Sequence, residues 1–356
     1  MSVKPHLKIV GMATIFVLCG CATVLDEDGA LAIAPYKIQA SGRIVVEARV
    51  NGQGPFAFAL DTGASISAIF DKLRNELQLE PIPGQVVLIH GTVASGRFPL
   101  LAVRSVEVGR EVWAENRFAS LPGDSVINTG IDGILGVDFL RQYAVGFSTR
   151  DRVVRLYPPE LVGGRSYRGW ATVPLEPEYI GKSGAAQYLV ETQLGSRRIP
   201  AIFDLGAGLN MINPAAAESI GFATIRSRDE NMVVGAVEDT PVLAWIRVDE
   251  VTTGNISWRN ELFAVAELEI LATLTHDDAP CAILGSGLFN QRDFIIDFVR
   301  NRLLIKVAMD EVDVVHPTDV ESLTQYHRDA ADNSLPLPLD GQFEQPCDSS
   351  PVSCGC

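Results

Sequence analysis

The sequence predicts a mainly β fold made of two homologous halves with few short helices. Strand-like runs such as RIVVEARV, FAFAL and RVVRLY alternate with glycine-rich turns from residue 36 to residue 157. The pattern breaks at Pro158-Pro159 and Gly163-Gly164, and a second strand-rich stretch follows up to about residue 307. Several motifs recur in the same order in both stretches, which is typical of a duplicated domain.

The repeat is clearest around two aspartates. PFAFALDTGASISAIF (55–70) aligns with IPAIFDLGAGLNMIN (199–213), so that Asp61 falls on Asp204 at an offset of 143. Further along, DGILGVDFL (132–140) aligns with CAILGSGLF (281–289) at an offset of 149. A predicted hairpin ends each half, in VGFSTRDRVVRLY and in IIDFVRNRLLIK. Ordered matches with slowly drifting offsets indicate duplication followed by small loop insertions.

At the N-terminus, Lys4 and Lys8 precede a short apolar run and then Leu18-Cys19-Gly20-Cys21. This arrangement resembles the lipobox of bacterial lipoproteins, in which cleavage falls before the cysteine and the cysteine carries the acyl chains. We therefore expect a signal peptide at residues 1–20, lipidation of Cys21 and a tether at residues 21–35. The resemblance implies a bacterial cell envelope location, and Ala22 after the cysteine favours the outer membrane, facing the periplasm. An ordinary secretory signal with incidental cysteines is the alternative.

The folded region is expected to comprise a first lobe at residues 36–160 and a second at residues 161–310. Each aspartate segment is followed by a predicted helix, FDKLRNEL in the first half and AAAESI in the second. The second has Asn213-Pro214 as cap and first position and Gly221 as its stop. Residues 311–356 lose periodicity, are rich in proline and acids, and are expected to be a disordered tail. The state of its cysteines, Cys347, Cys354 and Cys356, stays open.

Composition excludes some functions. The 44 acidic residues outnumber the 29 basic ones, for a formal net charge of -15, so nucleic-acid binding is not expected. The five histidines are scattered singly and no HExxH motif is present, so we predict no metal site.

Asp61-Thr62-Gly63-Ala64-Ser65, with its apolar flanks, resembles the active-site loop of the retropepsin-like and pepsin-like aspartic proteases. Ile134-Leu135-Gly136 and its second copy resemble the strand that crosses behind that loop in the family. The resemblance implies two closed β-barrel-like lobes with a central cleft. It also implies a catalytic pair, Asp61 and Asp204, acting on a peptide or protein substrate.

The same resemblance assigns the remaining site residues. Those expected to support the two loops are Thr62, Gly63, Ser65 and Gly206. Those expected in hairpin flaps over the cleft are His90, Gly91 and Gly235. In such enzymes one carboxylate acts as base on a water while its protonated neighbour supports the substrate carbonyl, because two adjacent carboxylates cannot both ionise. This chemistry implies no metal and no cofactor.

The second loop departs from the family pattern. Leu205 stands where threonine or serine is usual, and Gly208 replaces the hydroxyl residue that corresponds to Ser65. The Ser65 hydroxyl is expected to donate a hydrogen bond to the neighbouring carboxylate. Because such donors stabilise the ionised form, the hydroxyls of the first loop predict that Asp61 carries the negative charge and Asp204 the shared proton. The sequence thus favours an endopeptidase. The alternatives are a binding lipoprotein with weakened or lost catalysis, and a homodimer that pairs two copies of Asp61; a monomer is favoured because Asp204 is present.

Overall fold

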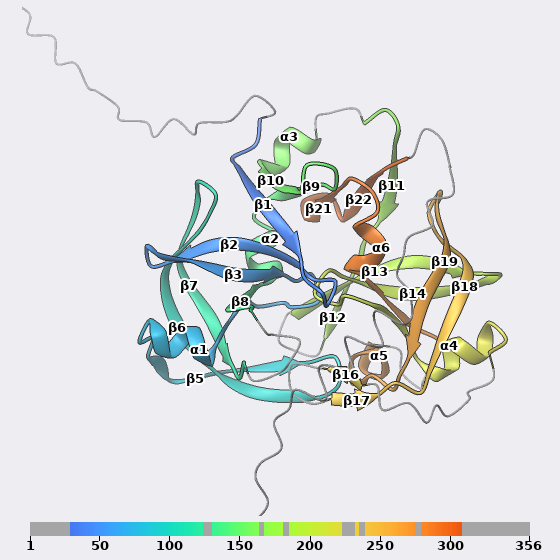
Figure 1. Cartoon of the computed structure of the whole chain (residues 1–356), viewed down its shortest axis with the longest axis horizontal. Coiled ribbons are helices and arrows are strands. Elements are labelled where there is room, and N and C mark those ends of the chain that lie inside the picture. Colours follow the sequence, from blue (N-terminus) through green and yellow to red (C-terminus); the bar gives the residue numbers. More distant parts are fainter. Residues whose placement is uncertain are drawn as a thin grey trace, which may run out of the picture.

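The computed structural model describes residues 29–123, 130–163, 167–180, 185–222, 232–234, 239–274 and 279–307. In these residues the fold is mainly β with six short helices, which confirms the predicted fold class. Two lobes lie side by side, and the strands that join them lie between and above them in Figure 1. The segments expected to be signal peptide, lipidated Cys21 and acidic tail lie outside the described residues, as does Gly235.

The first lobe is a closed barrel. Its strands follow the order β2-β3-β8-β4-β7-β6, and β2 also pairs with β6, which closes the ring. Large apolar side chains such as Phe58 and Phe118 fill the interior and are fully buried. The strands are β2 (Ile44–Val50), β3 (Gln53–Leu60), β8 (Gly133–Leu135), β4 (Ala68–Phe70), β7 (Glu111–Leu121) and β6 (Ser95–Val108).

The second lobe repeats this barrel strand for strand. Its order is β13-β14-β20-β15-β19-β18, and β13 pairs with β18 to close it. Phe203 and Phe263 are fully buried inside. The strands are β13 (Ala185–Leu194), β14 (Arg197–Asp204), β20 (Ala282–Gly285), β15 (Asn210–Ile212), β19 (Ile256–Val265) and β18 (Ala244–Thr253).

Strand register reproduces the offsets read from the sequence. In the first lobe Ala59 pairs in parallel with Ile134, and in the second Ile202 pairs in parallel with Ile283. The positions Ala59 and Ile202 differ by 143, and Ile134 and Ile283 differ by 149. The two halves are therefore duplicates in three dimensions, and both aspartate loops leave their barrels at the same point.

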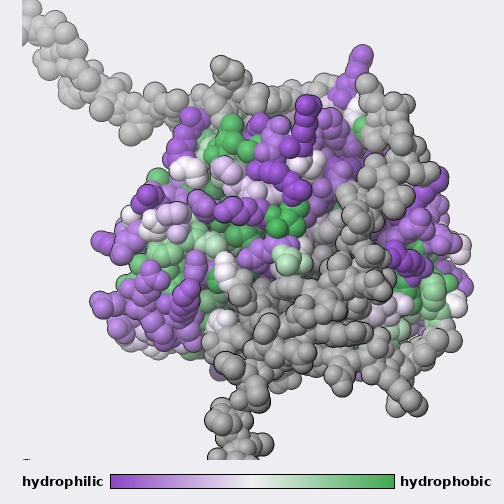
Figure 2. Space-filling model, in the orientation of Figure 1, coloured by the Kyte–Doolittle hydropathy of each residue, from purple (hydrophilic) through white to green (hydrophobic). Residues whose placement is uncertain are grey.

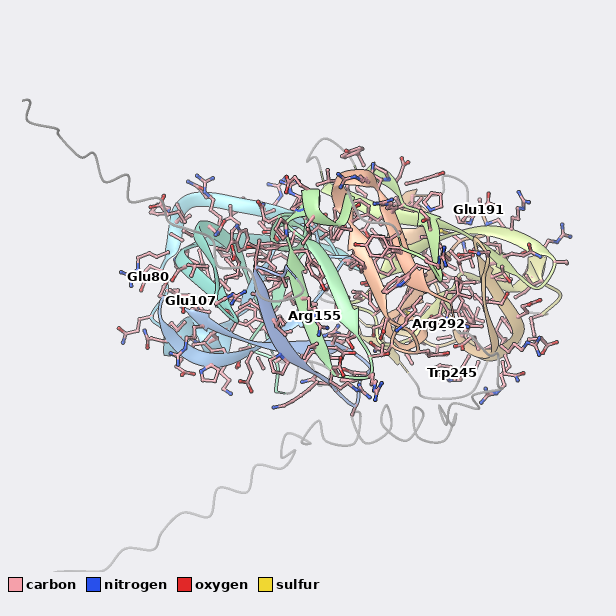
Figure 3. The ribbon with its side chains drawn as sticks, turned by 90° about the horizontal axis from the view of Figure 1, so that it is seen from above. Glu80, Glu107, Arg155, Glu191, Trp245 and Arg292 are labelled. Carbon is pink, nitrogen blue, oxygen red and sulfur yellow. The ribbon has the colours of Figure 1, made fainter. Side chains whose placement is uncertain are left out.

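A sheet of three strands from each half joins the lobes. Its order is β11-β22-β21-β9-β10-β1, so the two predicted hairpins, β9–β10 and β21–β22, meet at its centre. There Phe147 pairs with Phe294, and their rings stack with centroids 4.3 Å apart. Seen from above, Arg155 of β10 lies on this sheet between the lobes (Figure 3). The strands are β1 (Ala32–Ile38), β9 (Ala144–Ser148), β10 (Val153–Tyr157), β11 (Trp170–Pro174), β21 (Phe294–Asp297) and β22 (Arg302–Lys306).

Strand β1 corrects the expected start of the first lobe. We expected a tether up to residue 35, but Ala32–Pro35 already pair with β10. The alternating burial of β1 explains this, since Ala32, Ala34 and Tyr36 all point into the core. The fold therefore begins before the tyrosine that we took as its first residue.

The helices are short and lie at the ends of strands. The two predicted from sequence are α1 and α4, and α4 is capped as expected because the Asn213 side chain accepts a hydrogen bond from the amide of Ala216. Gly221 follows α4 with φ +91°. The helices are α1 (Asp71–Glu76), α2 (Val137–Leu140), α3 (Pro159–Gly163), α4 (Pro214–Ser219), α5 (Glu269–Leu274) and α6 (Ser286–Phe289), with a 3-10 turn at Phe298–Arg300.

Four further strands lie outside the barrels and the joining sheet. Strand β5 (Pro81–His90) forms a long hairpin with β6, β12 (Glu176–Ile180) pairs with β13, and β16 (Met232–Val234) pairs with β17 (Asp239–Pro241). Hydrophilic residues predominate on the face of the lobes seen in Figure 2, with smaller hydrophobic areas between them. No helix among the described residues has the length and apolar composition needed to span a membrane.

Candidate active site

Asp61 and Asp204 lie together where the two barrels meet. Asp61 directly follows β3, and Asp204 is the last residue of the equivalent strand β14. The two side chains hydrogen-bond to each other. The pair predicted from two loops 143 residues apart is thus assembled within one chain, with no need for a second copy.

Two glycines make this approach feasible. A Cβ placed on Gly63 would lie 2.7 Å from the carboxyl carbon of Asp204, and a Cβ on Gly206 would lie 2.2 Å from that of Asp61. Both distances are far inside van der Waals contact, so each glycine makes room for the carboxyl group of the opposite loop. This explains the glycine two residues after each aspartate.

Each carboxyl group is held by amides of its own loop. The Asp61 Oδ1 atom accepts from the amide of Ala64 at 2.8 Å, and the Asp204 Oδ1 atom accepts from the amide of Gly206 at 2.8 Å. The short helix that follows each crossing strand supports the loop from behind. The first amides of these helices, Val137 of α2 and Ser286 of α6, donate at 2.8 Å to the carbonyls of Ala64 and Ala207 respectively.

The electrostatics of the pair are unequal. Burial raises the pKa of Asp61, while the charge of Arg43 and the loop amides lower it. Burial, followed by the charge of Asp61, raises the pKa of Asp204 to about 7. These causes favour the negative charge on Asp61 and the shared proton on Asp204, but they act through Arg43 and the loop amides and not through the hydroxyls from which we expected this distribution.

Thr62 links the two lobes as expected. Its hydroxyl donates to the carbonyl of Phe203 at 2.8 Å and accepts from the amide of Leu205 at 2.9 Å. The side chain of Leu205 is fully buried in the core and contributes packing in place of the usual hydroxyl. The link between the loops is therefore made from one side only.

The expectation for Ser65 is corrected. We expected its hydroxyl to donate to the neighbouring carboxylate, but it points to the carbonyl of Ala186 at 3.5 Å. Gly208, its counterpart, is also explained by its surroundings, because a Cβ there would lie 1.5 Å from the carbonyl oxygen of Ser41. The turn between β1 and β2 fills the space that a hydroxyl side chain would need.

Two further residues at the site were not predicted. Arg43, just before β2, donates from Nε to the carbonyl of Gly206 at 2.7 Å. Gln187, in β13, donates from Nε2 to the carbonyl of Gly63 at 2.7 Å. The repeat, extended upstream of the aspartate loops, places these two residues at equivalent positions but does not indicate that each contacts the loop of the opposite lobe.

His90 and Gly91 lie at the tip of the β5–β6 hairpin, and this tip reaches the second lobe. The His90 Nδ1 atom lies 2.9 Å from the Ser95 hydroxyl, which donates to Glu269 of α5 at 2.5 Å. The amide of Ile270 donates to the carbonyl of Thr92 at 3.4 Å. The hairpin therefore crosses from one lobe to the other.

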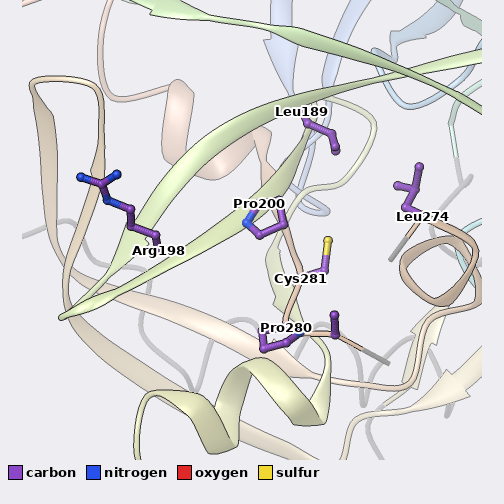
Figure 4. A pocket seen from close by; sticks show the side chains of 7 residues that line it. Leu189, Arg198, Pro200, Leu274, Pro280 and Cys281 are labelled. Carbon is purple, nitrogen blue, oxygen red and sulfur yellow. The ribbon is translucent and has the colours of Figure 1, made fainter. Parts of the chain in front are cut away.

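A separate pocket of about 440 Å³ lies on the second lobe (Figure 4). Burial raises the pKa of the Cys281 thiol in its wall to about 11, so this cysteine is a thiol at neutral pH and a poor nucleophile. No group of three or more potential metal ligands occurs among the described residues. The pocket residues are Leu189, Arg198, Pro200, Leu274, Ala279, Pro280 and Cys281.

A protein-family model described as aspartyl protease matches the chain twice, over residues 46–139 and over residues 190–287. The two matches together cover more than half of the chain, and each contains one aspartate loop and the strand that crosses behind it. No curated protein matches the chain.

Proposed function

The chain belongs to the aspartyl protease family, and from this membership we propose that it is an endopeptidase that hydrolyses peptide bonds with Asp61 and Asp204. The observation that carries the proposal is the hydrogen-bonded pair of carboxyl groups, one with a pKa raised to about 7. Such a pair retains one shared proton over a broad pH range below neutrality.

The different pKa values of the two carboxyl groups assign a different role to each aspartate. Asp61, ionised, takes a proton from a water molecule as that water attacks the substrate carbonyl carbon. Asp204, protonated, donates a hydrogen bond to the carbonyl oxygen and stabilises the charge that develops there. The proton taken by Asp61 then passes to the leaving amine, and the pair returns to its singly protonated state.

A second candidate function rests on Leu205. The hydroxyl usual at this position is absent, so the two loops are linked by the Thr62 hydroxyl alone. This is expected of a binding protein that has kept the fold but lost efficient catalysis. The intact pair and both glycines favour the enzyme, since a binding protein has no use for two carboxyl groups forced into contact.

The test is cleavage of a mixed peptide library by the purified protein between pH 3 and pH 8. The endopeptidase proposal predicts internal cuts that a statine-type inhibitor abolishes, because its hydroxyl takes the place of the attacking water. Peptide binding without cleavage at every pH would support the binding alternative instead.

We also propose that the enzyme is anchored to the outer membrane through lipid on Cys21 and acts on peptides in the periplasm. The support is the sequence Leu18-Cys19-Gly20-Cys21 after a short apolar run, with Ala22 following. Cys21→Ser should release the protein from the membrane fraction or block its maturation, and Cys19→Ser serves as the matched control. Normal maturation and unchanged membrane retention of Cys21→Ser would overturn the anchor.

A further inference from the structure

Arg43 and Gln187 occupy equivalent positions in the two lobes. Arg43 lies two residues before Val45, and Gln187 lies two residues before Leu189. Val45 pairs with Ala59 and Leu189 pairs with Ile202, and these last two residues are equivalent through the offset of 143. The duplicated fold therefore places one arginine and one glutamine at the same structural position.

Both side chains make the same contact across the lobe boundary. Arg43 donates to the carbonyl of Gly206 and Gln187 to the carbonyl of Gly63, each at 2.7 Å. Each of these glycines packs directly against the carboxyl group of the opposite loop. Arg43 is thus bonded to the residue that touches Asp61.

The two contacts differ in charge. Guanidinium is always protonated, whereas the glutamine amide is neutral. Gln187 is 4% exposed, and its Oε1 atom is buried without a hydrogen-bond partner in the structure. In the second lobe the neutral Gln187 amide thus supports the Gly63 carbonyl, although this leaves the Gln187 Oε1 atom buried without a partner. A hydrogen bond to the glycine carbonyl therefore does not in itself require the positive charge of Arg43 in the first lobe.

We propose that Arg43 is a positioning residue that presents a positive charge to the aspartate pair through Gly206 and sets the pH range in which the pair holds one proton. Gln187 gives the same mechanical support without the charge. The inference rests on the proposed peptidase function for its kinetic test, but its second test needs no activity.

Arg43 lowers the pKa of both carboxyl groups. The other charge among the main causes of the two shifts is that of Asp61, which raises the pKa of Asp204. Titratable side chains on the elements packed around the site are bonded elsewhere: Asp138 to Ser67, and His90 and Glu269 to Ser95.

The test is the pH profile of kcat/KM for Arg43→Gln, which gives both lobes the same neutral donor. Loss of the positive charge raises both pKa values of the pair, so the acid limb and the alkaline limb should both move to higher pH. We expect a shift of about one pH unit, the size typical of one charge acting over several ångströms in a protein. Arg43→Lys keeps the charge and should leave both limbs in place.

Arg49→Gln is the matched control, because Arg49 also donates to a glycine carbonyl, that of Gly52 at 3.2 Å, but on the exposed side of the first lobe. Its profile should match that of the wild type. A lower maximum of kcat/KM for Arg43→Gln, with both limbs of the pH profile unmoved, would show that Arg43 has only a structural role and would overturn the proposal. A shift of the profile for Arg43→Lys equal to that for Arg43→Gln would overturn it too. If Arg43→Gln does not fold, Arg43→Met replaces it as the neutral variant.

The pH dependence of thermal unfolding separates this proposal from the proposed function. The midpoint temperature of unfolding falls as the pH rises towards the pKa of the pair in the folded protein. In Arg43→Gln this fall in the midpoint temperature should extend to higher pH. If the wild type cleaves no peptide but the fall shifts, only the peptidase proposal fails. If the enzyme is active but neither the kinetic limbs nor the fall shifts, only the role of Arg43 fails.

Discussion

The carboxyl group of Asp61 occupies the space that a side chain on Gly206 would need, with its carbon 2.2 Å from the position of a Cβ. The reciprocal relationship holds between Asp204 and Gly63. The two loops therefore interlock, and the separation of the carboxyl groups is fixed by backbone contact between the lobes.

This contact predicts the outcome of Gly206→Ala. The added methyl group must displace Asp61 or push the loops apart, so kcat/KM should fall by more than about 100-fold, the loss typical of misplaced catalytic groups. Gly195→Ala is the control, because that residue has φ +55° and no atom within 4 Å of an added Cβ. It should cost about 1–2 kcal/mol of stability and leave kcat/KM unchanged. Wild-type activity in Gly206→Ala would contradict the interlocked geometry.

The raised pKa of Asp204 predicts how stability depends on pH. The folded protein holds a proton up to about pH 7, whereas the unfolded chain releases it near the ordinary value of 3.8. The stabilisation is therefore complete below about pH 4 and is lost as the pH rises to about 7, by at most about 4 kcal/mol. Thermal midpoints between pH 4 and pH 8 should fall less for Asp204→Asn than for the wild type. The exposed Asp249→Asn should behave as the wild type, and parallel curves for all three proteins would refute the shift.

Thr62 predicts a coupling between stability and activity. Thr62→Val removes two buried hydrogen bonds to the second lobe and should destabilise the protein by about 2–3 kcal/mol, while kcat/KM falls more than tenfold. Thr192→Val also removes a buried hydroxyl contact, to Thr253 at 3.2 Å within the second barrel. It should lower stability without the loss of kcat/KM. Equal kinetic effects of the two variants would show that Thr62 has no special role between the lobes.

The tip of the β5–β6 hairpin predicts a change in substrate binding. Glu269→Ala removes the acceptor of the Ser95 hydroxyl and loosens the contact of the tip with α5. KM should rise several-fold with little change in kcat, since Asp61 and Asp204 are untouched. Glu191→Ala, which breaks only an exposed ion pair with Arg198 at 3.6 Å, should alter neither constant. An unchanged KM in Glu269→Ala would exclude a role of this contact in binding.

The sequence predicted the duplicated β fold and the meeting of Asp61 and Asp204, because the repeat fixes equivalent positions in both barrels. It did not predict that the joining sheet is one unit. Each hairpin was recognisable in its own half of the chain, but β9 pairs with β21, which lies in the other half of the chain. The start of β1 was missed because AIAPYKI is short and contains a proline.

The errors at the site have a similar cause. Ser65 was assigned by its place in the loop, but its hydroxyl is directed by the neighbouring strand β13, which lies 121 residues away at Ala186. Arg43 lies 163 residues from Gly206 along the chain, so no local pattern indicates their contact. Contacts between the lobes depend on how the barrels are placed, and periodicity within one barrel carries no information about that placement.

The most direct test of the account is the measurement of kcat/KM for Asp61→Asn and Asp204→Asn on a peptide that the wild type cleaves, with folding verified by thermal unfolding. Because the water needs both a base and a protonated partner, each variant should lose activity by at least about 1,000-fold. Full loss in Asp61→Asn with wild-type activity in Asp204→Asn would contradict a pair formed within one chain.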